Sequence, residues 1–214
     1  MPCGHTRGMT EPIDKSKIIR DAATIILLRH DKNNPQVLMG QRGAKAVFMP
    51  NKFVFPGGAV DRADYTAPPV EIDAKTTGLL CQHAPNGAAQ ALCTAALREL
   101  SEETGLVLNP QQNAFRFMFR AVTPPGRPRR FDARFFLADA AGINSPLDDF
   151  SNASDELSHL HWIDLAEAKS LDLPFITEVV LSEVIAITNN PAQPRDVPFF
   201  RHDGGQSHFS LLTA

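Results

Sequence analysis

The sequence has 214 residues, of which 43% are hydrophobic and 21% are charged, so the chain can bury a substantial core and we expect one main domain. Its formal net charge of −3 provides no overall attraction to nucleic acid or to an anionic membrane. No apolar run reaches the roughly 18–20 residues that span a bilayer. We therefore expect neither nucleic acid nor a membrane as a partner.

The cysteines and the N-terminal residues indicate the cellular compartment. Cys3, Cys81 and Cys93 are odd in number and form no CxxC pair, which argues against a disulfide framework and against a zinc site. Residues 1–17 lack the apolar core of a signal peptide. Both observations favour a cytoplasmic location.

In chain order, we expect residues 1–20 to be a flexible segment and the apolar run AATIILLR (22–29) to be a central strand covered on both faces. The turn DKNNP leads to QVLMGQR (36–42), the expected hairpin partner of that strand. Residues 48–55 lead into Pro-Gly-Gly at 56–58, where two glycines permit the backbone to approach a ligand or an adjoining helix closely.

An insertion at about 65–90 follows. Residues 65–87 carry three prolines and two glycines without a sustained period, so we expect an irregular excursion with one short helical turn. The segment 88–104 is rich in Ala, Leu, Glu and Gln and lacks proline and glycine, which predicts a helix capped by Gly105.

The second half of the chain predicts further strands and a helix. FRFMFRAV (115–122) and RRFDARFFLA (129–138) predict antiparallel strands joined by TPPGRP. Residues 159–165 predict a short strand running into a helix, and 176–187 predict an amphipathic helix. We expect the tail, 190–214, to be irregular and docked by its phenylalanines. These elements predict an α/β fold, a sandwich of helix, sheet and helix layers with a mixed central sheet.

Three carboxylates stand out on the helix predicted at 88–104. Glu99, Glu102 and Glu103 fall within an arc of about 100° near its C-terminal end, where like charges repel and the helix dipole adds a penalty of roughly 0.3–1 kcal/mol. A hard divalent cation would reverse both effects. The spacing leaves two interpretations open: a cation site, or a solvated acidic face beside Arg98.

The stretch RELSEETGL (98–106) resembles the second half of the signature of the Nudix hydrolase family, and every position fits. The signature begins with a glycine, five residues, a Glu and seven residues. Here Gly58 is followed after five residues by Asp64 in place of Glu, and 33 residues separate Asp64 from Arg98. Counting back seven residues from Arg98 finds Gln90 instead. We favour Asp64, because FPGGAVDRAD is continuous with the glycines.

The resemblance implies a Nudix-like α/β/α sandwich over 21–189 that hydrolyses the diphosphate linkage of a nucleoside diphosphate derivative with Mg²⁺ or Mn²⁺. FMPNKFVFPGGAVD, the insertion, RRFDARFFLA and HWIDL resemble the branch of peroxisomal coenzyme A diphosphatases and their bacterial relatives. Coenzyme A and acyl-CoA are therefore expected substrates, although the tail lacks the terminal Ser-Lys-Leu of a peroxisomal protein. Homodimers are common among such folds, and one is left open here.

The resemblance also implies roles for single residues. Glu99, Glu102 and Glu103 would be metal ligands or, for one of them, the base, with the Gly57 carbonyl as a further ligand and Arg98 orienting a glutamate. The general base is left open. The residues that complete the expected site are the additional acids Asp64, Asp155 or Glu156 and the substrate-binding residues Arg42, Gly58, Arg130 and Arg134.

Each of these assignments has a structural alternative. The arginines at 129, 130 and 134 alternate with phenylalanines and could cover the solvent face of the sheet, Arg42 could pair with an acid, and Asp155 and Glu156 could cap a turn. The departure at Asp64 also leaves a second function open, a non-catalytic Nudix-fold module that binds nucleotides or regulates.

Overall fold

The computed structural model describes residues 18–30, 34–109, 116–203 and 205–213. Its central strand is β1 (Ile19–His30), which lies between β2 (Pro35–Arg42) and β6 (Arg130–Asp139). Ile25, Ile26 and Leu27 have no exposed surface, because both faces of β1 are covered. The predicted central strand and its hairpin partner are confirmed. The strand starts earlier than expected, so the end of the predicted flexible segment is sheet, and residues 1–17 lie outside the described part.

The described strands form one nine-stranded mixed sheet. Its order is β3-β2-β1-β6-β5-β8-β9, and in addition β4 pairs with β1 and β7 with β2. The pairs β1–β6 and β5–β8 are parallel, and the other pairs are antiparallel. The remaining strands are β3 (Phe53–Val54), β4 (Gly57–Ala59), β5 (Arg116–Val122), β7 (Leu157–Asp164), β8 (Val197–Asp203) and β9 (Gln206–Leu212).

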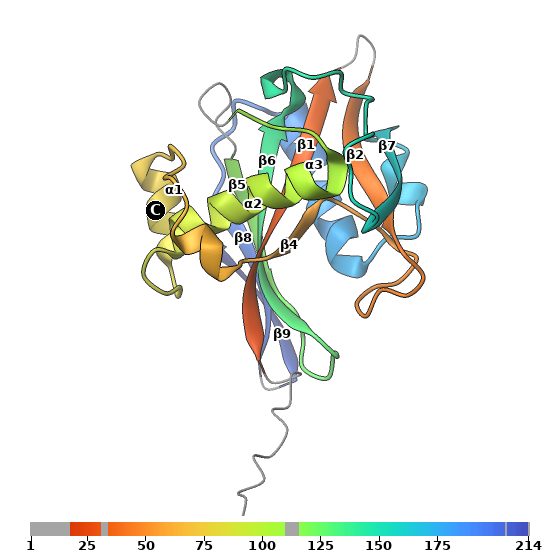
Figure 1. The fold of residues 1–214 in the computed structure, drawn as a ribbon. Helices are drawn as coiled ribbons and strands as arrows, with labels where there is room; N and C mark the ends of the chain where they lie inside the picture. Colours follow the sequence, from red (N-terminus) through yellow and green to blue (C-terminus); the bar gives the residue numbers. More distant parts are fainter. Residues whose placement is uncertain (1–17, 31–33, 110–115, 204, 214) are drawn as a thin grey trace, which may run out of the picture.

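Helices cover both faces of this sheet (Figure 1). The long helix α2 (Ala88–Thr104) crosses one face together with α1 (Ala74–Cys81), and α3 (Phe175–Asn189) packs on the other. Alternate residues of β1 divide between the two cores: Ile25 packs on the α2 side and Ile26 on the α3 side. The predicted α/β fold with a mixed sheet is confirmed.

Most of the elements expected in the second half are present. The helix predicted at 88–104 has those bounds, and Gly105 ends it in the left-handed conformation with φ 75°. The strands β5, β6 and β7 and the helix α3 are also confirmed, although residue 115 lies outside the described part. The helix expected after β7 is a single 3₁₀ turn, Ala168–Ser170.

The insertion is more ordered than expected. It begins with a 3₁₀ turn, Arg62–Tyr65, and the prediction of one short helical turn is wrong, because α1 spans eight residues. The Asp73 side chain caps α1 by accepting a hydrogen bond of 2.8 Å from the Thr76 N–H. The prolines of the segment flank α1 rather than interrupt it.

The prediction of an irregular tail is wrong. Residues 197–212 form the hairpin β8–β9, which adds to the sheet through parallel pairing of β8 with β5. The overlooked signal is a turn sequence, HDGGQ, between two segments rich in apolar residues, VPFF and HFSLL. Phe199 does anchor the tail, since it is buried in the α2-side core.

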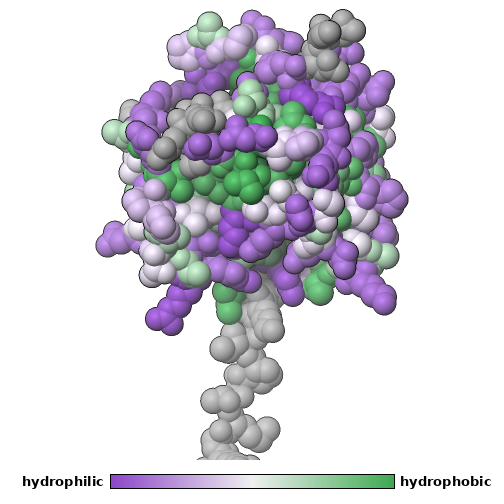
Figure 2. Space-filling view, turned by 45° about the horizontal axis from the view of Figure 1, so that its top comes forward, coloured by the Kyte–Doolittle hydropathy of each residue, from purple (hydrophilic) through white to green (hydrophobic). Residues whose placement is uncertain are grey.

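The side of the molecule drawn in Figure 2 is mainly hydrophilic and has one central apolar area. Within the described ranges, no helix has both the length and the apolar character that crossing a membrane requires.

The burial of the tail can be tested with two phenylalanines of the same hairpin. We expect Phe199→Ala to lower the free energy of unfolding by roughly 3–5 kcal/mol, because Phe199 is 6% exposed. In dilute solution, where each chain is on its own, Phe209→Ala should change it by less than about 0.5 kcal/mol, because Phe209 is 60% exposed in the single chain. Urea denaturation measures both, and equal effects would contradict the docked hairpin.

Candidate active site

The glycine loop and the carboxylate helix meet at β4. Strand β4 pairs antiparallel with β1, with Gly57 opposite Thr24 and Gly58 opposite Ala23. The Gly57 N–H donates a hydrogen bond of 2.8 Å to Glu103 Oε2. A Cβ atom on Gly58 would lie 2.2 Å from Glu99 Oε1. Of the two reasons expected for these glycines, the close approach of a helix is therefore the one observed.

Arg98 is the centre of the ionic contacts at this junction. Its Nε and Nη2 donate to Asp64 Oδ1 and Oδ2, each at 3.1 Å, so the two side chains form a bidentate ion pair. Its Nη1 donates to Glu99 Oε1 at 2.9 Å and to Glu102 Oε2 at 3.0 Å. Hydrogen bonding to Asp64 is the main cause that raises the pKa of Arg98. The guanidinium therefore orients Glu99 and Glu102.

Asp64, rather than Gln90, is the acidic partner of Arg98. Asp64 is 3% exposed, and its Oδ2 also accepts a hydrogen bond from the Asp61 N–H. Gln90 lies at the start of α2, where its side chain accepts from the Val70 N–H. Both Asp64 oxygens accept hydrogen bonds, and the carboxylate holds the Arg98 guanidinium in place. The role of Asp64 as an additional acid stays a prediction.

The glutamates at 99, 102 and 103 differ in burial and therefore in how readily they ionise. Glu103 is 2% exposed, and burial raises its pKa to about 8, with Glu99 and Glu156 adding to the rise and Gly57 and Arg42 opposing it. The pKa of Glu99 is raised by burial as well, against the effect of Arg98. The exposed Glu102 shares Arg98 with Glu99. The most buried carboxylate is thus the one that most resists carrying a negative charge.

Glu156 reaches this cluster through the loop that follows β6. The Ser154 N–H donates to the Glu102 carbonyl at 2.8 Å, which holds this loop against the end of α2. Glu156 is exposed, and its charge contributes to the raised pKa values of both Glu99 and Glu103. Of the two acids expected here, Glu156 is therefore the one whose charge acts on the cluster. Ser154 acts through its backbone, so no motif could have revealed it.

The donor chemistry of the cluster fits a divalent cation. Five carboxylates (Asp64, Glu99, Glu102, Glu103 and Glu156) accompany two guanidinium groups (Arg42 and Arg98), which gives a formal charge of −3 when all are ionised. All the negative groups offer oxygen, the donor that Mg²⁺ and Mn²⁺ prefer. Within the described ranges, however, no three His, Cys, Asp or Glu side chains converge as a ready-made metal site. Arg98 and the Gly57 N–H hold the carboxylate oxygens in this arrangement.

The expected substrate-binding arginines are not brought together. Arg42 ends β2, and its charge lowers the pKa of Glu103. Arg130 pairs in register with Ile19, five residues along β1 from Thr24, which is roughly 16 Å from the level of Gly57.

Arg134 has no exposed surface and is ion-paired with Asp21 and Asp132. This burial contradicts the alternative of a solvent-facing side chain, whereas the assignment of Arg134 to substrate binding stays a prediction.

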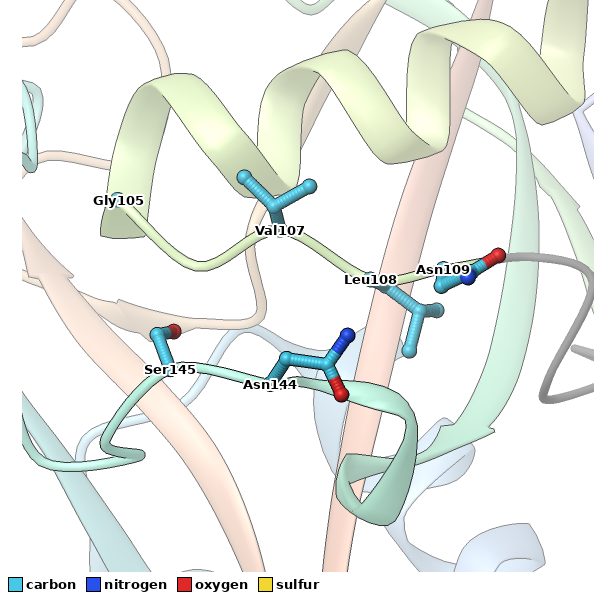
Figure 3. A pocket seen from close by; sticks show the side chains of 6 residues that line it. All are labelled: Gly105, Val107, Leu108, Asn109, Asn144 and Ser145. Atoms are coloured by element: carbon cyan, nitrogen blue, oxygen red, sulfur yellow. The ribbon is translucent and has the colours of Figure 1, made fainter.

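A cavity of about 670 Å³ lies beyond the C-terminal end of α2 (Figure 3). Figure 3 shows Val107 and Leu108 on one side of it and Asn144 and Ser145 on the other. No carboxylate lines this cavity, so it is separate from the carboxylate cluster.

A family model for the NUDIX domain matches residues 73–183, slightly more than half of the chain. The chain belongs to the Nudix family. The matched range contains α2 but begins after Gly58 and Asp64, so the match omits these two residues of the first half of the motif. The structure brings that half to Arg98 in space.

Other Nudix proteins resemble this one in sequence and fold. The crystal structure of a Nudix hydrolase from Alicyclobacillus acidocaldarius is 26% identical and has a TM-score of 0.58, covering 79% of this chain and 92% of that one. The NUDIX domain of Shewanella oneidensis NrtR, solved with ADP ribose, is 15% identical with a TM-score of 0.55, covering 80% and 90%.

A curated Caenorhabditis elegans protein whose name includes "nudix hydrolase 7" is 29% identical over 181 residues, which cover 69% of this chain. Our chain matches 52% of the length of that relative.

The close approach at Gly58 can be tested with one methyl group. We expect Gly58→Ala to lower the free energy of unfolding by roughly 1–3 kcal/mol, because the new Cβ would overlap the Glu99 carboxylate. Gly43→Ala is the matched control, since nothing lies within 4 Å of a Cβ at that position. Urea denaturation compares the two, and a neutral Gly58→Ala would show that Glu99 is not held against β4.

The buried Glu103 predicts a pH dependence of stability in metal-free protein. Its pKa is about 8 in the folded chain, above the ordinary value of 4.5, so the folded state binds the proton more tightly. The stabilisation is complete below about pH 4.5 and is lost as the pH rises to about 8. We expect Glu103→Gln, which cannot ionise, to become progressively more stable than the unmodified chain over this range, by about 1.4 kcal/mol per unit of pKa shift.

Urea denaturation in the presence of a chelator, repeated across this range, measures the difference. Glu178→Gln, at an exposed position of α3, is the matched control and should follow the unmodified chain. A constant difference between Glu103→Gln and the unmodified chain would contradict the assignment.

Proposed function

We propose that the chain hydrolyses the diphosphate linkage of a nucleoside diphosphate derivative with the help of Mg²⁺ or Mn²⁺. The observation that carries this proposal is the carboxylate cluster on α2, in which the buried Glu103 lies beside Glu99 while Arg98 is held by Asp64. Membership of the Nudix family and the hydrolase names of its relatives support it.

Glu99, Glu102 and Glu103 would hold the cation, with the Gly57 carbonyl as a further ligand. In an antiparallel ladder, alternate residues direct both backbone groups toward the neighbouring strand. The Gly57 N–H binds Glu103 on α2, so the carbonyl of the same residue also points away from β1. When bound, the cation would neutralise diphosphate oxygens and lower the pKa of a coordinated water.

The chain's own residues would supply orientation and proton transfer. Arg98 holds Glu99 and Glu102 in place, and Asp64 prevents it from turning away. Arg42 would contact substrate phosphate oxygens, since its positive charge already acts on Glu103. The proton of the attacking water would pass to Glu103 or to Glu156, both of which belong to this cluster.

We propose coenzyme A or an acyl-CoA as the substrate, on the basis of the sequence resemblance to the coenzyme A diphosphatase branch. ADP-ribose is a second candidate, because it is the ligand in the NrtR structure. The net charge of −3 supports a small-molecule substrate rather than nucleic acid, and the cysteine pattern supports a cytoplasmic location.

The proposal is tested with a panel of coenzyme A, acyl-CoA, ADP-ribose, a nucleotide sugar and a nucleoside triphosphate, assayed with Mg²⁺ or Mn²⁺ and with a chelator. We expect cleavage of at least one diphosphate, abolished by the chelator. Glu103→Gln should lower kcat by roughly 10²-fold or more, because it removes a charged group from the reacting centre. Glu178→Gln, on the opposite face of the sheet, should retain activity.

Unchanged turnover in Glu103→Gln would contradict the assigned site. Tight nucleotide binding without cleavage of any substrate would contradict the enzyme and favour a binding module.

A further inference from the structure

The strand β9 leaves one edge of the sheet open. It is the last strand in the sheet order, and among the described residues only β8 pairs with it. Because alternate residues of an antiparallel strand direct their backbone groups to the neighbour, the others direct theirs outward. An exposed edge of this kind is a template for a further strand.

Nothing in the sequence of β9 protects this edge. The strand reads QSHFSLL and contains no proline and no Lys, Arg, Asp or Glu, the residues with which proteins block edge pairing. The opposite edge differs. There β7 contains His159 in a left-handed conformation, with φ 51°, and its pairing with β2 shifts register between Met39 and Gln41. Such irregularities disfavour pairing with another strand.

An apolar surface accompanies the open edge. Phe209 and Leu211 are 60% and 55% exposed, and they share one face of β9 because they are two residues apart. Phe209 lies opposite Phe200 on β8, and the Phe200 ring centroid is 6.0 Å from that of Phe175, which is 64% exposed. The aromatic surface therefore continues from β9 onto the start of α3.

The area suits a second copy of the chain. A phenylalanine offers roughly 150–250 Å² of surface, so Phe175, Phe209 and Leu211 together expose roughly 300 Å² per copy. Two copies thus contribute roughly 600 Å² of apolar side-chain surface, about half of the roughly 1,200 Å² at the lower end of specific interfaces, and the paired backbones of two seven-residue strands add to it. The strand is anchored in its own sheet, since Gln82 Nε2 donates to the Thr213 carbonyl beyond its end.

We propose that two copies of the chain associate through antiparallel pairing of β9 with β9 of the other copy, about a twofold axis near Phe209. The pairing joins two sheets into one and places the Phe209 and Leu211 surfaces of both copies side by side on the same face. It brings no like charges opposite each other, because β9 has no Lys, Arg, Asp or Glu. A twofold axis lets one surface serve both copies.

The test is the molar mass of the full chain in solution, measured by light scattering after gel filtration over a range of concentrations. We expect twice the chain mass of 23.4 kDa for the unmodified protein. The double variant Phe209→Lys with Leu211→Lys should have the mass of one chain, because four charges would face one another across the axis. Its thermal unfolding, measured at low concentration, should stay cooperative, since both positions are exposed.

Val107→Lys is the matched control, since Val107 is an equally exposed apolar residue that lies outside this surface, and it should remain a dimer. An unmodified chain of single mass at every concentration would overturn the proposal. So would a double variant that is folded and still dimeric. A full chain of single mass that dimerises only after removal of residues 1–17 would mean that its own N-terminal segment occupies the edge, which also overturns it.

Discussion

The ion pair between Arg98 and Asp64 is the contact on which the candidate active site depends. A buried carboxylate is tolerated only when its charge is matched, and Asp64 is matched by two hydrogen bonds from one guanidinium. The same guanidinium donates to Glu99, Glu102 and the Ala59 carbonyl. One side chain thus aligns the helix, strand β4 and the start of the insertion. Without it, Glu99 and Glu102 would lose the donor that holds them.

This ion pair also explains how the motif accommodates a long insertion. The entropic cost of closing a loop rises slowly with its length. The free-energy cost of a longer excursion is therefore modest when its two ends are held together. Here Asp64 holds one end on Arg98, and Gln90 binds the Val70 backbone within the excursion. Arg120, itself paired with Asp132, donates to the Gln82 carbonyl at the end of α1. The excursion is attached to both the helix and the sheet.

The carboxylate cluster is assembled against its own electrostatics. A pKa of about 8 means that Glu103 in the metal-free chain holds a proton near neutral pH rather than a charge. Such a group contributes little to stability at high pH, whereas a cation would make its ionised form favourable. Strongly shifted carboxylates of this kind mark functional sites more often than purely structural ones. The open edge at β9 belongs to a different part of the sheet, so the proposed association and the proposed hydrolysis use separate surfaces.

The sequence by itself determined the elements and the chemistry that depend on local pattern. The apolar run of β1, the composition of α2 and the spacing of its glutamates predicted a covered strand, a helix and a carboxylate stripe, because these features arise from residues close in the chain. Only the tertiary structure decided which distant residues meet. Asp64 pairs with Arg98 although 33 residues separate them. Arg134 is buried and pairs with Asp21. The tail forms a hairpin that joins the sheet by pairing with β5. Sheet order and register depend on contacts between segments that are far apart in the chain. The hydrophobic periodicity within one segment does not specify which other segment will pack against it.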